Sequence, residues 1–242
     1  MTLLLLAGTA EARYLAQVLA SERRAAIASL AGATRRPRPL ELPTRIGGFG
    51  GESGFVRYLV EAGITAVLDA THPFASRISE RTARICATKN VPYCQLLRPE
   101  WAPIAGDHWT LLAAEEDAAA HIPKGMTVFL ATGRQGVTRF ANLTGRHLIC
   151  RVVDLPDEAF PFENGEYLVG RPPFSPEAER GLFERLGVDW LVVKNAGGRD
   201  SESKLAAART LGLPVAMIAR PPQPSAMRVE TVPAALDWVR GL

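Results

Sequence analysis

Several short segments place small, polar and charged residues directly after stretches that have the pattern of buried strands. The most informative is Val193–Lys204, in which a strand is followed by a polar turn with adjacent glycines and then by a helix. The chain has only four lysines, and two of them, Lys194 and Lys204, lie in this segment. A turn that leads into a helix presents unpaired backbone amides and the positive end of the helix dipole, so this segment is typical of an anion-binding site.

Two further turns share this pattern. Gly8–Arg13 follows a strand and opens a helix, and Ala131–Gly136 does the same, with Arg134 beside the predicted helix start. A phosphate there would be held by amides and, at the second turn, by a guanidinium. The alternative is structural: Gly8 makes the tight turn, Thr9 caps the helix and Arg134 is an exposed turn residue. The first turn has neither the G-x-G-x-x-G nor the G-x-x-x-x-G-K-[ST] motif.

The segment Asp69–Ala75 offers a histidine at the carboxyl end of a predicted strand. Ligands of open α/β sheets collect outside that end, so Thr71 and His72 would face a ligand. His72 could donate a hydrogen bond or a proton, although a lone histidine is more often structural. Pro73 would occupy the first position of the next helix.

A glycine-rich segment, Gly47–Gly54, has five glycines in eight residues. Such density lets the backbone approach a ligand closely or lets a loop move, and a flexible surface loop is the alternative. The nearest match to G-x-G-x-x-G starts at Gly48 but has Ser53 at its last position.

Composition restricts the class of protein. The chain has 242 residues, 47% of them hydrophobic and 22% charged, which predicts a globular protein of one large or two compact domains. The net charge of +3 is mild, and only Thr34–Arg38 resembles a basic cluster, so we expect no nucleic-acid partner. The apolar run Leu3–Ala7 is far shorter than the roughly 20 residues of a membrane helix, and no basic segment precedes it. We therefore expect a cytoplasmic protein without a membrane partner.

The three cysteines predict no special chemistry. Cys86, Cys94 and Cys150 are widely spaced and form no C-x-x-C pair, which favours reduced, packed thiols. We expect no metal site.

Predicted strands and helices alternate along the chain, separated by turns, and this pattern is typical of parallel α/β sheets. We predict strands at 3–7, 26–31, 66–70, 92–97, 126–131, 147–153, 190–193 and 215–218. We predict helices at 10–20, 55–62, 73–88, 135–143, 175–186, 201–211 and 233–239. This alternation is interrupted around Arg98–His108. We therefore predict two Rossmann-like or flavodoxin-like α/β lobes with parallel sheets, residues 1–122 and 123–242, with a cleft between them.

The position that selects between NAD and NADP in dinucleotide folds lies roughly 20 residues after the first turn. Here the second strand is followed by Ala33-Thr34-Arg35-Arg36, without a carboxylate. If a dinucleotide binds, Arg35 and Arg36 favour NADP, although Arg134, Lys194 or Lys204 could hold the extra phosphate instead.

Taken together, these segments resemble the precorrin-6A reductase family of cobalamin biosynthesis, and they follow the family's order along nearly the whole chain. The resemblance rests on Gly8–Arg13, Gly47–Gly54, Asp69–Ala75, Arg98-Pro99-x-Trp101, Thr132–Arg134 and Lys194–Lys204. Two positions depart from the family pattern, Ala7 and Pro172, where glycine is expected.

The resemblance implies an NADPH-dependent reduction of one double bond in the precorrin-6A macrocycle, giving precorrin-6B. We expect a monomer or weak homo-oligomer whose only other ligand is this tetrapyrrole. His72 is the candidate catalytic residue. Contacts with the macrocycle are assigned to Arg13, Gly48, Gly50 and Thr71. Contacts with the cofactor or its phosphates are assigned to Thr9, Thr132, Gly133, Arg134, Lys194, Asn195, Gly198, Ser201 and Lys204.

Two alternatives stay open. The first is reduction of the cobalt-containing macrocycle of the anaerobic pathway with NADH, against which the Arg35–Arg36 position argues. The second is a non-catalytic two-lobed protein that binds a polyanionic ligand.

Overall fold

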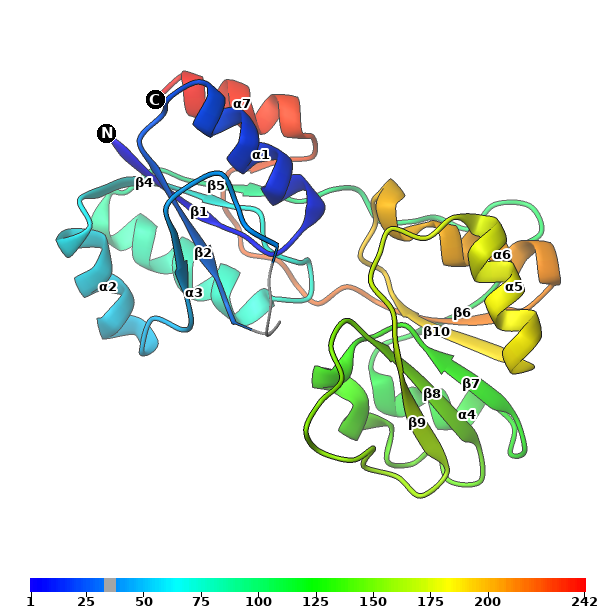
Figure 1. Cartoon of the computed structure of the whole chain (residues 1–242). Coiled ribbons are helices and arrows are strands. Elements are labelled where there is room, and N and C mark those ends of the chain that lie inside the picture. Colours follow the sequence, from blue (N-terminus) through cyan, green and yellow to red (C-terminus); the bar gives the residue numbers. More distant parts are fainter. Residues whose placement is uncertain (33–37) are drawn as a thin grey trace. The chain divides into compact units, whose positions relative to one another are not determined.

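In the computed structural model, which describes residues 1–32 and 38–242, every described strand pair is parallel (Figure 1). The expected NADP-selecting residues Arg35 and Arg36 and most of the basic segment Thr34–Arg38 lie outside the described residues. The chain forms two compact units. The first unit consists of Met1–Pro99 and Pro221–Leu242, and the second unit of Glu100–Arg220.

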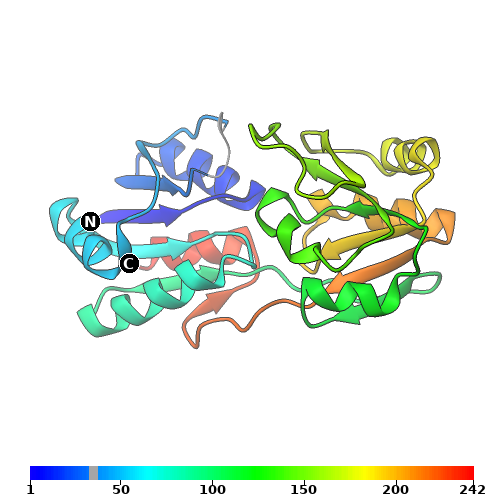
Figure 2. The same cartoon turned by 90° about the horizontal axis from the view of Figure 1, so that it is seen from below.

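This division differs from the single boundary that we predicted between residues 122 and 123. β6 (His108–Leu112) pairs with β11 (Pro214–Ile218) and so joins the second unit. β12 (Arg228–Val229) pairs with β5 (Tyr93–Leu96) and returns the end of the chain to the first unit. In Figures 1 and 2 the red carboxyl-terminal segment accordingly lies in the same unit as the blue amino-terminal segment.

The first unit has the Rossmann strand order. Its sheet runs β12-β5-β4-β1-β2-β3 among the described strands, which is the order 3-2-1-4-5-6 read from the other edge. Its other elements are β1 (Thr2–Leu6), α1 (Ala10–Ser21), β2 (Ala26–Leu30), β3 (Thr44–Ile46), α2 (Gly51–Glu61), β4 (Ile64–Asp69), α3 (Ser76–Lys89) and α7 (Val232–Arg240).

The central strand β1 explains why both sheet faces are covered. Side chains alternate across a strand, so Leu3 and Leu5 pack into the core beneath α1 and α7, whereas Leu4 and Leu6 pack beneath α2 and α3. All four leucines are at most 2% exposed. Figure 1 shows α1 and α7 together on one face and α2 and α3 on the other. The continuous apolar run of β1 therefore reflects burial on two faces.

The sheet of the second unit has the same Rossmann order in space, but its outermost strand comes from the start of the unit in the chain. Its sheet runs β6-β11-β10-β7-β8-β9 among the described strands, so the strand that comes first in the chain takes the outermost sixth place. The other elements are α4 (Ala118–His121), β7 (Thr127–Leu130), β8 (His147–Val152), β9 (Gly165–Val169), α5 (Pro176–Leu186), β10 (Trp190–Lys194) and α6 (Ser203–Leu211). Three short 3-10 helices, Glu115–Asp117, Arg134–Phe140 and Arg199–Ser201, complete the described elements.

One predicted helix is wrong in type. The segment expected as a helix at 135–143 is the 3-10 helix Arg134–Phe140. Its sequence includes Gly136 and the β-branched Val137 and Thr138, which have low helix propensity. Arg134 is the first residue of this 3-10 helix, so it does not lie beside the amino terminus of an α-helix as we expected.

Candidate functional site

Most of the predicted site residues lie at one point in each sheet, the topological switch point, whereas Arg13, Gly48, Gly50, Ser201 and Lys204 lie outside it. In the first unit the chain leaves β1 toward β2 and β3 and later returns to β4 on the other side of β1. In the second unit the same reversal separates β7 from β10. Ligands of doubly wound sheets bind outside the carboxyl ends of the two strands that flank such a point. Those ends carry the loops 7–9 and 70–75 in the first unit, and 131–134 and 195–198 in the second; we call these the switch-point loops.

Thr9 joins the two switch-point loops of the first unit. Its hydroxyl donates to the carbonyl of Ala70 at 2.8 Å and accepts from the amide of Ala12 at 3.1 Å, as a helix N-cap. The structural interpretation of Thr9 as a cap is therefore confirmed. Its predicted cofactor contact stays a prediction, and Arg13 is exposed on the following turn of α1.

A buried carboxylate holds the loop after β4. Asp69 is fully buried, and its Oδ1 accepts from both the amide of Thr71, at 3.0 Å, and the Thr71 hydroxyl, at 2.7 Å. Its Oδ2 accepts from the hydroxyl of Tyr93 at 2.9 Å. Burial raises the pKa of Tyr93, and the nearby Asp69 charge raises it further, so the phenol stays a donor. The Thr71 side chain is thus oriented by the protein and lies 3.3 Å from the hydroxyl of Ser79.

His72 is exposed in this loop, and its Nδ1 accepts from the amide of Phe74 at 3.3 Å. The helix predicted to start at Pro73 begins only at Ser76, because residues 72–75 form a turn. The side-chain amide of Gln223 donates to the carbonyl of Pro73 at 2.9 Å and accepts from Gln95 at 2.9 Å. The loop that presents His72 is therefore fixed on one side by Asp69 and on the other by Gln223.

The glycine-rich segment is held by an arginine. Arg45 donates to the carbonyls of Gly47 at 2.8 Å and Gly48 at 2.9 Å, and its guanidinium lies 3.9 Å from the ring centre of Phe49. Gly50 has a φ of 76° and precedes the first residue of α2. Gly48 and Gly50 are exposed, and their predicted contact with the substrate stays a prediction.

In the second unit, Thr132 carries a polar atom that needs a partner. Its Oγ1 is buried and has no hydrogen-bond partner among the residues that the structure describes. Gly133 follows with a φ of 74°, and nothing in the described chain lies within 4 Å of the place where its Cβ would stand. The turn is therefore open beside an unsatisfied hydroxyl, which suits a polar ligand.

Lys194 is paired with a carboxylate that we did not predict. Its Nζ lies 3.2 Å from Oε1 of Glu115, whose side chain is only 5% exposed and also binds Arg139. Gly136 packs against both groups: a β-carbon there would stand 3.3 Å from Glu115 Oε1 and 3.5 Å from Lys194 Nζ. Since Glu115 belongs to a turn 79 residues before Lys194, no local pattern reveals this pair.

Asn195 does not present its side chain to a ligand. Its Oδ1 accepts from the amide of Trp101 at 2.9 Å, and its Nδ2 donates to the Trp101 carbonyl at 3.1 Å. The Trp101 indole in turn donates to the carbonyl of Gly198 at 3.1 Å. Asn195 and Trp101 together therefore shape the loop after β10.

Lys204 and Ser201 also lie together. The Lys204 ammonium donates to the Ser201 carbonyl and stands 5.7 Å from the ring centre of Trp101. Lys204 is 9% exposed, so it is a partly desolvated cation on the first turn of α6 rather than a solvated surface lysine.

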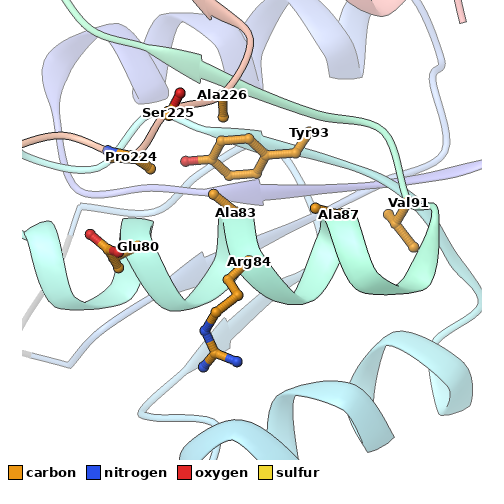
Figure 3. Close-up of a pocket in the computed structure, with 9 residues that line it drawn as sticks. All are labelled: Glu80, Ala83, Arg84, Ala87, Val91, Tyr93, Pro224, Ser225 and Ala226. Atoms are coloured by element: carbon orange, nitrogen blue, oxygen red, sulfur yellow. The ribbon is translucent and has the colours of Figure 1, made fainter.

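A pocket of about 420 Å³ lies elsewhere on the first unit (Figure 3). In Figure 3 the ring of Tyr93 lies between α3 and residues 224–226. None of the residues that line this pocket is a predicted site residue. Tyr93 links the pocket to the loop after β4, because its hydroxyl donates to Asp69.

Within residues 1–32 and 38–242, no group of three or more His, Cys, Asp or Glu side chains is arranged to hold a metal ion. None of the helices in the same ranges has the length and apolar character needed to cross a bilayer.

The strand orders and the switch-point loops define a two-unit α/β protein with the topology of dinucleotide-binding domains. The chain belongs to the precorrin-6x reductase family CbiJ/CobK, whose model matches residues 2–240. A precorrin-6A reductase of Rhodococcus erythropolis is 43% identical over 240 residues, covering 98% of this chain and 96% of the relative. One of Rhodobacter capsulatus is 40% identical over 238 residues, covering 98% and 95%.

A solved structure described as CobK precorrin-6A reductase superposes with a TM-score of 0.96 at 39% identity, covering all of this chain and 96% of the other. The family resemblance and the two parallel α/β lobes that the sequence predicts are therefore confirmed.

Proposed function

We propose that this chain reduces one double bond of the precorrin-6A macrocycle with NADPH, giving precorrin-6B. The observation that carries this proposal is that most of the predicted residues lie at the two topological switch points, in a member of the precorrin-6x reductase family. NADPH, when bound, supplies the hydride. The protein therefore has to bind the cofactor and the macrocycle, orient them against each other and exclude water from them.

We assign the cofactor to the switch-point loops of the second unit. Two features support this assignment: the buried Oγ1 of Thr132, which has no partner among the described residues, and the open turn at Gly133. Lys204 and Arg134 supply positive charge for phosphate oxygens, whereas the charge of Lys194 is offset by Glu115. The predicted Gly198 contact is assigned to its backbone amide, because its carbonyl accepts from Trp101. Asn195 is instead assigned to shaping the loop, because its side chain binds Trp101. The Asn195 backbone is also engaged, since its amide donates to the Ile218 carbonyl and its carbonyl accepts from Arg220.

We assign the macrocycle to the switch-point loops of the first unit and to the exposed glycine backbone at Gly48 and Gly50. Arg13 on α1 supplies a cation for a substrate carboxylate. His72 is exposed on a loop fixed by Asp69 and Gln223, and we assign to it the delivery of a proton to the carbon next to the one that accepts the hydride.

The test is anaerobic oxidation of the reduced nicotinamide, followed by absorbance. NADPH and NADH are each mixed with the purified full chain and with metal-free or cobalt-containing precorrin-6A. We expect rapid oxidation with NADPH and the metal-free macrocycle. Faster oxidation of NADH with the cobalt form would replace the proposed substrate and cofactor, and no oxidation in any combination would support a binding protein instead.

Two variants separate the roles of the two units. Arg134→Ala should weaken NADPH binding without changing the melting temperature, and unchanged affinity would make Arg134 a surface residue. His72→Ala should lower turnover without changing NADPH binding, and full activity would make His72 structural.

A further inference from the structure

An ion pair stands at the carboxyl ends of β8 and β9. Arg171 Nη2 donates to Asp154 Oδ1 at 2.6 Å, and the two side chains are 39% and 24% exposed. Val152 of β8 pairs with Val169 of β9, so Asp154 and Arg171 each follow by two residues at the same sheet edge as the Thr132 loop. No predicted role includes either residue.

The position of Asp154 in the topology is informative. β8 is the strand reached by the first crossover from β7, on the side of β7 away from β10, which is the place of the second strand in a dinucleotide fold. In that fold a carboxylate about 20 residues after the first turn binds the ribose of NAD, and an arginine nearby accommodates the 2′-phosphate of NADP. Asp154 follows Gly133 by 21 residues. The second unit therefore has a carboxylate, Asp154, at the position that binds the ribose in dinucleotide folds, and this carboxylate is paired with Arg171.

The loop that bears Arg171 is fixed by packing. Arg151 of β8 donates to both carboxylate oxygens of the buried Glu179, at 2.7 and 2.8 Å, and its guanidinium lies 4.4 Å from the ring centre of Phe174. Gly170 fits closely against these two side chains: its Cβ would stand 3.1 Å from Phe174 Cζ and 3.2 Å from Arg151 Cδ. Arg151 is thus committed to the interior, whereas Arg171 is held at the surface of this edge.

We propose that Asp154 and Arg171 form the ribose end of the cofactor site and that Arg171 selects the 2′-phosphate of NADPH. The inference rests on the proposed NADPH function and assigns phosphate selection to the second unit instead of Arg35 and Arg36. An unpaired carboxylate at this position would repel the phosphate. Arg171 offsets that charge, and a guanidinium with five N–H donors can bind a carboxylate and a phosphate oxygen together.

The test is calorimetric titration of the full chain with NADP⁺ and with NAD⁺. Arg171→Ala should weaken NADP⁺ binding about tenfold or more and leave NAD⁺ within about twofold, because only the phosphate contact is lost. Asp154→Asn should change the ratio in the opposite direction, weakening NAD⁺ while NADP⁺ binds equally or more tightly. Arg180→Ala, on the exposed side of α5, is the matched control and should change neither affinity.

If the ion pair only stabilises the loop, Arg171→Ala and Asp154→Asn should have the same effect on both nucleotides, since both variants break the same bond. Equal loss of both nucleotides in both variants would overturn the inference, as would a shift of the ratio in an Arg35→Ala, Arg36→Ala variant but not in Arg171→Ala. If the unchanged chain binds neither nucleotide, the proposed cofactor and this inference fail together. If it binds NADP⁺ and Arg171→Ala leaves the ratio unchanged, only this inference fails.

Discussion

A β-carbon on Gly54 would stand 1.8 Å from the carbonyl oxygen of Phe49, closer than any two such atoms can approach. Gly54 lies in α2, and Phe49 lies in the glycine-rich segment that precedes that helix. The absence of a side chain at Gly54 therefore decides where the exposed backbone of Gly48 and Gly50 runs.

Replacement of Gly54 by alanine should disrupt this segment. We expect Gly54→Ala to lower the free energy of unfolding by about 2 kcal/mol or more, since the clash is with backbone and cannot be relieved by a side-chain rotation. The control is Gly181→Ala in α5, where nothing described lies within 4 Å of the new methyl group. That change should raise stability by about 0.5–1 kcal/mol. Urea unfolding measures both, and equal effects would contradict the prediction.

Asn195 should matter for stability rather than through a side-chain contact with a ligand. Asn195→Ala leaves the Trp101 amide and carbonyl without their partner, which should cost about 1–3 kcal/mol. Asn142→Ala removes an exposed bond to the Glu116 carbonyl and should cost far less. Chemical denaturation compares the two variants, and a neutral Asn195→Ala would show that the bonds to Trp101 do not hold the loop.

Thr132 and Thr9 should respond oppositely to replacement by valine. The Thr132 hydroxyl is buried without a partner among the described residues, so Thr132→Val should leave stability unchanged or raise it, while weakening NADP⁺ binding. Thr9→Val removes a helix cap and should cost about 1 kcal/mol. Thermal unfolding and calorimetric titration distinguish the cases. A Thr132→Val protein that binds NADP⁺ normally would exclude this hydroxyl from the cofactor site.

The three buried thiols should make the fold sensitive to high pH. Burial raises the pKa of Cys86 and Cys150 to about 12 and that of Cys94 to about 11, above the ordinary value of 9.0. The folded state therefore retains these protons more strongly than the unfolded state. The contribution of these thiols to stability should be constant well below pH 9 and fall as the pH rises toward 11 to 12, by up to about 1.4 kcal/mol per pH unit for each thiol.

Urea unfolding at pH 8 and at pH 10 measures this fall. The Cys150→Ala variant is less stable at both pH values because it leaves a cavity, but its loss between them should be smaller. The same loss in both proteins would show that Cys150 does not titrate differently in the two states. Tyr93, whose pKa is also raised, contributes to the fall in both proteins alike.

Much of the fold follows from local patterns in the sequence. The apolar run of β1 and the helical spacing of α1 are visible because burial on both sheet faces and on one helix face leaves a regular pattern. β6 could not be recognised, since it is an edge strand with two exposed positions among five, in a segment that follows prolines. β12 is only two residues long and has no period to detect.

The candidate site shows the same contrast. Loops after strands are recognisable from small and polar residues, so Thr132 and His72 could be selected. The groups that orient these loops come from distant segments: Glu115 reaches Lys194, Trp101 reaches Asn195, and Gln223 reaches Pro73. Such pairs depend on tertiary packing and leave no signal at a fixed spacing.

The sixth strand of the first unit, β12, follows the whole second unit in the chain. The first unit therefore can be completed during synthesis only after the second. A ribosome releases β6 through β11 before β12 and α7, so the second unit has all of its described strands while the first unit still lacks its sixth. The amino-terminal unit must wait with the outer edge of β5 uncovered until the last residues emerge. Loss of the final twenty residues would therefore damage the part of the protein that is made first.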